Sequence, residues 1–182
     1  MKILERKVAY VCPIFKVEER RVLLDSGKEK IFYVIVRAPN VSVIALTNDQ
    51  KIVLIKEIIG EDRRECLALP SGKVDNYISN EEEVKKQALT ELREESGYTA
   101  EKIEFLCKDD HPWTTIDRDY YRYVAWNLTF VGQDLEDGEN ITPYLVSVKE
   151  AEEIIKERKM TSADEEKALI RAINFFKENQ LI

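Results

Sequence analysis

The chain has 182 residues, of which 44% are hydrophobic and 35% are charged, and its formal net charge is −7. This length allows one sizeable core, with or without a small appendage, and the composition excludes fibrous and disordered proteins. Nucleic-acid binders present a basic face, whereas the basic residues here are scattered, so we expect no nucleic-acid partner. A small anionic substrate is compatible with this charge if a divalent cation bridges it to the protein.

The sequence also bears on cellular location. No apolar run approaches the ~18 residues of a membrane span, and the first residues lack the apolar stretch of a secretory signal. The cysteines, Cys12, Cys66 and Cys107, have no metal-ligand spacing, which predicts buried thiols in a reducing compartment. We therefore expect a cytoplasmic protein that makes no membrane contact.

The first 37 residues predict a small antiparallel β-meander. Residues 6–15 alternate and are rich in β-branched and aromatic side chains, which is typical of a strand. Residues 20–24 and 30–36 predict two further strands, joined by a turn at 25–28. Three short strands are marginal alone, so we expect the meander to pack on something else.

Residues 38–182 predict a second, larger unit. Strands, a helix, more strands and then two helices indicate an α+β fold, here an α/β/α sandwich around a mixed sheet. The expected strands cover 41–47, 51–55, 66–69, 103–106, 120–130 and 141–148, with a hairpin turn at 48–50 and a loop at 109–119, and the expected helices cover 82–96, 149–158 and 163–179.

The predicted helix at 82–96 has clear signals at both ends. Ser79 and Asn80 each stand three residues before a glutamate, which is the spacing of a capping box. Gly97 follows the helix at the position that favours a left-handed residue. The boundaries of this helix are therefore well defined by local chemistry.

The C-terminal end of this helix carries Glu91, Glu94 and Glu95. Carboxylates there oppose the helix dipole, at about 0.3–1 kcal/mol each, and repel one another. At 100° per residue they border the apolar stripe of the helix. A solvated acidic helix end is one interpretation; the other is a site for a hard divalent cation, which prefers oxygen ligands.

The segment from Gly72 to Tyr98 resembles the Nudix box, written GX5EX7REUXEEXGU with U apolar. Two departures stand out: Thr90 replaces the usual Arg, and the loop from Gly72 to Glu82 is longer by four residues. In the family the Arg orients the neighbouring glutamate, so the resemblance implies that Glu91 is held less firmly here. The matching positions are Gly72, Glu82, Glu91, Leu92, Glu94, Glu95, Gly97 and Tyr98.

A weaker similarity to the ADP-ribose pyrophosphatase branch extends over most of the chain. It includes Pro13-Ile-Phe-Lys and Leu69-Pro70-Ser71-Gly72-Lys73. That branch uses an N-terminal β-meander for dimerisation. The resemblance thus implies a homodimer formed through residues 1–37 and a Nudix-like catalytic domain at 38–182.

The resemblance implies metal-dependent hydrolysis of the diphosphate bond in ADP-ribose or a nucleotide sugar, giving two phosphate monoesters. The cofactor would be Mg²⁺, with Mn²⁺ as an alternative. Its ligands would be Glu91, Glu94, Glu95 and the carbonyl of Ser71. For Glu82 we favour a structural role in the first turn.

The remaining site residues follow from the same resemblance. Glu139 is the expected general base, with Asp137 second, and Glu91 and Glu94 join it as catalytic candidates. For His111 we favour a loop or substrate contact over a role as the base.

Substrate contacts are expected from Arg63, Arg64 and Trp113, an aromatic platform for a base. Residues 56–59 fall where relatives carry an Arg-rich stretch that grips the substrate, but they contain no arginine. The sequence therefore does not specify which diphosphate compound is the substrate. The alternative function is a catalytically weakened Nudix-fold protein that binds nucleotides or regulates a partner.

Overall fold

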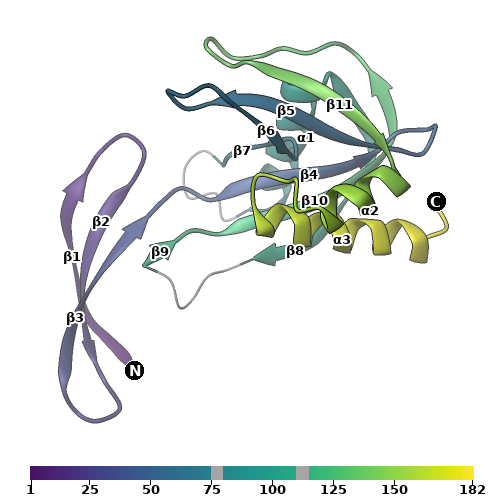
Figure 1. Ribbon diagram of the computed structural model, residues 1–182. Coiled ribbons are helices and arrows are strands. Elements are labelled where there is room, and N and C mark those ends of the chain that lie inside the picture. The colour runs from purple at the N-terminus through teal and green to yellow at the C-terminus, as the bar shows by residue number, and fades with distance from the viewer. Residues whose placement is uncertain (75–79, 110–114) are drawn as a thin grey trace.

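The computed structural model describes residues 1–74, 80–109 and 115–182. These residues form two β-sheets and three helices (Figure 1). The strands are β1 (Lys2–Val11), β2 (Lys16–Leu23), β3 (Glu29–Val36), β4 (Asn40–Leu46), β5 (Lys51–Ile59), β6 (Arg64–Ala68), β7 (Ser71–Lys73), β8 (Tyr98–Asp109), β9 (Ile116–Asp117), β10 (Tyr120–Phe130) and β11 (Ile141–Ser147), and the helices are α1 (Glu81–Ser96), α2 (Val148–Lys156) and α3 (Ala163–Glu178).

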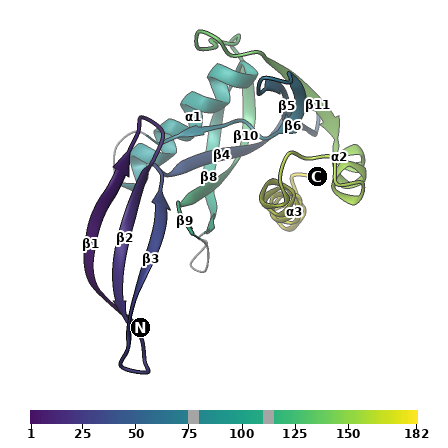
Figure 2. The same ribbon diagram turned by 60° about the vertical axis from the view of Figure 1, so that its left-hand side comes forward.

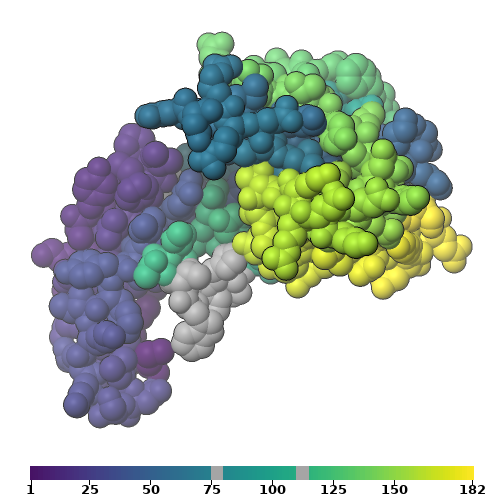
Figure 3. Space-filling model, in the orientation of Figure 1, coloured from purple at the N-terminus to yellow at the C-terminus, as the bar shows by residue number. Residues whose placement is uncertain are grey.

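The smaller sheet has the strand order β1-β2-β3-β9. It stands to one side of the rest of the molecule (Figures 2 and 3). The strand expected at 6–15 is displaced, because the chain turns after Val11 and the Cys12 N–H donates to the Phe15 carbonyl at 2.9 Å. Pro13 lies in this turn and has no N–H for a strand ladder.

The larger sheet has the order β11-β5-β4-β10-β8, with β6 paired to β5 and β7 paired to β4. Strands β4 and β10 are parallel, and the other pairs are antiparallel, so the sheet is mixed. The strand expected at 103–106 is longer, because β8 pairs with β10 along its whole length. The loop expected at 109–119 contains β9, which pairs with β3.

Helices cover both faces of the larger sheet (Figures 1 and 2). Alternate residues of β4 divide between the two layers: Val41, Val43 and Ala45 pack with the buried face of α1, whereas Ile44 and Leu46 pack with α2 and α3. The fold is therefore α+β, with the sheet sandwiched between helices. This confirms the predicted architecture.

The structure also bears on the expectations about membrane spans and cysteines. Across residues 1–74, 80–109 and 115–182, no helix has the length and apolar character needed to cross a membrane. Cys12, Cys66 and Cys107 are all unpaired, as expected, but each is half-buried rather than fully enclosed.

Candidate active site

Helix α1 positions the acidic cluster, and Asn80 and Gly97 cap it as expected, although the Asn80 side chain accepts from Glu82 and not from Glu83 as in a capping box. The Asn80 side chain accepts the Glu82 N–H at 3.1 Å, which makes Asn80 the N-cap. Gly97 has φ of 78° and donates its N–H to the Arg93 carbonyl. Val84 and Leu92 are buried against the sheet, so the rotation of α1 is determined by its apolar stripe.

This rotation carries Glu95 into the interior, where only 6% of the residue is exposed. Its carboxylate accepts the Ser71 N–H at 2.7 Å, and its own carbonyl accepts a hydrogen bond from Gln133. Burial, together with repulsion from Glu91, raises the pKa of Glu95 to about 9. The side chain of Glu95 thus links α1 to β7. Among the described residues, no cationic side chain pairs with it.

Glu91 lies one turn earlier on the same face, against Gly72. A Cβ at position 72 would lie 2.0 Å from Glu91 Oε1, so only glycine leaves room for this carboxylate. Gln87 Nε2 donates to the same oxygen at 2.8 Å. Burial raises the pKa of Glu91 to about 7, and the Gln87 hydrogen bond opposes part of this rise.

The short strand β7 presents its main chain to these two carboxylates. Ser71 and Gly72 pair with Ser42 and Val41 of β4. The Asn40 side chain also donates to the Gly72 carbonyl at 2.7 Å. Strand β7 thus pairs with β4 of the sheet and also contacts the carboxylates of α1.

Glu94 and Glu139 border this pair without touching it. Glu94 is half-buried, and its pKa is raised by burial and then by repulsion from Glu136. Glu139 is exposed in the loop before β11, and its carboxylate accepts the Glu136 N–H at 2.9 Å. Its negative charge contributes to the raised pKa of Glu91 and of Glu95, so it lies within electrostatic reach of both.

The described residues offer donor atoms that suit a divalent cation, but they do not form a complete set of ligands. In the described ranges, no group of three His, Cys, Asp or Glu side chains stands close enough to hold a metal ion. The donors themselves suit Mg²⁺, because carboxylate and carbonyl oxygens are its preferred ligands. Glu91 and Glu95 both contact the Ser71–Gly72 segment and repel each other, a conflict that a cation between them would relieve.

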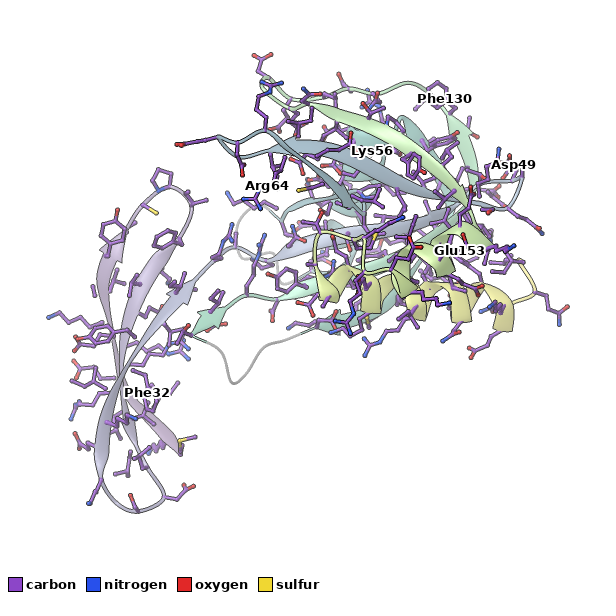
Figure 4. All side chains as sticks on the ribbon, viewed as in Figure 1. Phe32, Asp49, Lys56, Arg64, Phe130 and Glu153 are labelled. Carbon is purple, nitrogen blue, oxygen red and sulfur yellow. The ribbon has the colours of Figure 1, made fainter. Side chains whose placement is uncertain are left out.

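Among the described residues, neither predicted substrate arginine forms a salt bridge with these carboxylates. Arg64 is highly exposed, pairs with Asp62 at 2.6 Å and sits near the end of the β5–β6 hairpin (Figure 4). Arg63 occupies the turn of that hairpin with φ of 51°. Trp113 and His111 lie outside the described residues. Arg64 lines a hollow together with Cys66, Leu67, Met160 and Thr161.

Three residues that were not singled out from the sequence also shape the site. Gln87 donates to Glu91 from one helical turn earlier, and this i−4 position is a signal that sequence inspection could have used. Asn40 and Gln133 come from other parts of the chain and contact the site only through the fold.

Comparisons with known proteins relate this chain to a family. The profile of the NUDIX domain matches residues 36–172. The methanol dehydrogenase activator of Bacillus methanolicus is 31% identical over 129 residues, covering 69% of this chain and 68% of that protein. The ADP-ribose pyrophosphatase of Bacillus subtilis (strain 168) is 26% identical over 144 residues, covering 78% and 76%.

Among solved structures, one described as an ADP compounds hydrolase superposes with a TM-score of 0.82 at 19% identity, covering 100% of this chain and 96% of that one. This likeness shows the shared fold. The NUDIX match spans most of the chain and includes α1 with its three carboxylates. The chain therefore belongs to the NUDIX family, as an enzyme of the Nudix pyrophosphohydrolase type.

Proposed function

We propose that this protein hydrolyses the diphosphate bond of a nucleoside diphosphate derivative, ADP-ribose or a nucleotide sugar, in a reaction that depends on Mg²⁺ or Mn²⁺. Water adds to one phosphorus, the bridging P–O bond breaks, and two phosphate monoesters leave. The single observation that carries the proposal is the placement of Glu91 and Glu95 of α1 on the Ser71–Gly72 segment of β7.

Under this proposal Glu91, Glu94, Glu95 and the Ser71 carbonyl hold the metal. When bound, the cation neutralises phosphate charge and acidifies water. Gln87 keeps Glu91 in place, and the Ser71 N–H does the same for Glu95. Glu139 removes the proton from the attacking water, supported by its exposed loop position within electrostatic reach of Glu91 and Glu95.

The substrate class is supported by relatives that are named an ADP-ribose pyrophosphatase and an ADP compounds hydrolase. The residues that would grip the substrate differ from the Arg-rich pattern of that branch. Lys56 pairs with Glu65 at 3.1 Å and lies 4.8 Å from the centre of the Tyr144 ring. Arg63, Arg64 and Trp113 remain the proposed contacts for the part of the substrate beyond the diphosphate.

The test is release of phosphate monoesters from ADP-ribose, nucleotide sugars and dinucleoside polyphosphates, each with Mg²⁺, with Mn²⁺ and with chelator. Turnover of ADP-ribose or a nucleotide sugar that chelator abolishes supports the proposal. Folded protein that turns over none of these compounds with either metal would overturn it.

We also propose that residues 1–37 form the dimer interface of a cytoplasmic homodimer. Strand β1 lies at the edge of the small sheet, and all ten of its residues are exposed. Such an edge is a template for pairing with another chain. The exposed apolar side chains of this region are Met1, Ile3, Leu4, Val8, Tyr10, Val11, Ile14, Ile31, Phe32 and Tyr33.

A second candidate function is regulation of a partner enzyme by a catalytically weakened Nudix protein. It is favoured by the relative named a methanol dehydrogenase activator and by Thr90, which stands where the box has Arg. The same substrate panel separates the two, because rapid metal-dependent turnover contradicts catalytic weakening.

A further inference from the structure

We infer that the junction between the two sheets holds a second site, which binds a phosphate group through Arg37 and Arg118. The junction lies where β3 meets β9 and where β4 and β10 begin (Figure 2). This site is independent of the carboxylates of α1 and of the hydrolysis proposed above.

Arg118 is the centre of the site. Its side chain is half-buried, Nε donates to the Ala38 carbonyl at 3.1 Å, and the guanidinium lies 5.0 Å from the centre of the Tyr120 ring. These contacts orient a guanidinium without neutralising its charge.

Two other arginines lie beside Arg118. The Arg37 N–H donates to the carbonyl of the adjacent Asp117 at 3.1 Å, and the guanidinium of Arg122 lies over the same Tyr120 ring as that of Arg118. Burial lowers the pKa of Arg118, and the positive charges of Arg37 and Arg122 lower it further, whereas Tyr120 opposes this shift. Arg122 lies 5.2 Å from the centre of the same tyrosine ring. A local excess of positive charge therefore exists within a chain whose net charge is −7.

The neighbouring carboxylates are already engaged with other cations. Asp117 pairs with Arg20 at 2.6 Å, and Asp119 pairs with Lys108 at 2.8 Å. Asp109 pairs with Lys167 at 3.0 Å and faces the buried Arg122. Counting only residues 1–74, 80–109 and 115–182, neither Arg37 nor Arg118 has a carboxylate in salt-bridge contact.

The site lies on the face of the sheet opposite α1. Tyr121 and Tyr123 of β10 pack in the layer of α1, and Val124 packs in the layer of α3. Alternation along the strand places Tyr120 and Arg122 on the α3 face. Glu91 and Glu95 approach from the other face, so one bound phosphate would not contact both sets of residues.

A phosphate group matches this chemistry. Guanidinium groups bind phosphate through paired N–H donors, and Arg37 is exposed and available to complete such a pair beside Arg118. The phosphate belongs either to a nucleotide or to free inorganic phosphate, since both present the same oxygens.

The test is isothermal titration calorimetry of the full-length protein in chelator, with inorganic phosphate, AMP and adenosine as separate probes. Chelator prevents metal-dependent binding and turnover, so the result stands whether or not hydrolysis is found. The variants are Arg118→Gln, Arg37→Gln and the control Arg6→Gln, which removes the same charge from an exposed position on β1.

We expect wild type and Arg6→Gln to bind phosphate alike, and Arg118→Gln and Arg37→Gln to bind it about tenfold more weakly. Arg37→Gln guards against misfolding, because the exposed Arg37 side chain makes no salt bridge in the described residues. AMP binding that exceeds phosphate binding, with none for adenosine, assigns the site to nucleotides, and equal affinities assign it to free phosphate. No saturable phosphate binding, or equal weakening in Arg6→Gln, would overturn the inference.

Discussion

Replacing Gly72 by alanine tests whether the position of the Glu91 carboxylate matters for catalysis. The added Cβ would lie 2.0 Å from Oε1 and 2.1 Å from Cδ, whereas ordinary contact begins at 3.4 Å. The carboxylate is the end of a flexible side chain, so it moves rather than unfolding the protein. Its departure breaks the hydrogen bond from Gln87, which costs about 0.5–1.5 kcal/mol of stability.

The catalytic effect should be larger than the effect on stability. A displacement of this size at a metal ligand is expected to lower kcat/KM by about 100-fold, since misplacement by about 1 Å has that effect on positioned groups. The assay is metal-dependent release of phosphate monoester, with thermal unfolding in chelator measured in parallel. Titration with Mn²⁺ should show weaker binding in the Gly72→Ala variant.

The matched control is the same substitution in a Glu91→Ala background, where the side-chain atoms that clash are absent. There Gly72→Ala should change neither stability nor residual turnover, because Gly72 has no positive φ that would disfavour alanine. Wild-type turnover and wild-type Mn²⁺ affinity in the single variant would refute the assigned role of Glu91.

Three further outcomes are expected. Glu95→Gln should abolish metal-dependent turnover and leave the metal-free protein at least as stable, since it removes a buried, repelled carboxylate; thermal unfolding in chelator that shows clear destabilisation would contradict this. Burial raises the pKa of Glu165 to about 7, so its stabilising contribution is complete below pH about 4.5 and is lost as pH rises through 7, by up to about 3 kcal/mol. The free energy of unfolding in urea should therefore fall less between pH 5 and pH 8 in Glu165→Gln than in wild type. An equal fall in the two proteins would contradict the raised pKa of Glu165. Val8→Asp, on the exposed edge strand β1, should shift a homodimer towards monomer in light scattering, and an unchanged mass, or a monomeric wild type at micromolar concentration, would remove residues 1–37 as the interface.

The local part of the candidate site was predictable from the sequence. Capping by Asn80, termination at Gly97 and the apolar stripe of α1 all depend on neighbours within a few residues. These features are sufficient to predict that Glu91 and Glu95 border the core. The same kind of local signal explains why the bounds of α1 were predicted closely.

Contacts across the fold were not predictable in the same way. The length of β8 depends on its pairing with β10, and the small strand β9 exists only because β3 lies beside it. The displaced start of β1 has a similar cause, since β-branched residues favour a strand without specifying its register.

By itself the sequence determined which helix carries the carboxylates and which face of it they occupy, because helical periodicity and capping are local. Only the tertiary structure decided that Ser71 and Gly72 meet those carboxylates. It alone also placed Arg37 and Ala38 beside Asp117 and Arg118, through the Arg37 N–H to Asp117 carbonyl and Arg118 Nε to Ala38 carbonyl hydrogen bonds. The physical reason is that strand pairing and side-chain packing join residues far apart in the chain, and no local pattern encodes those distances.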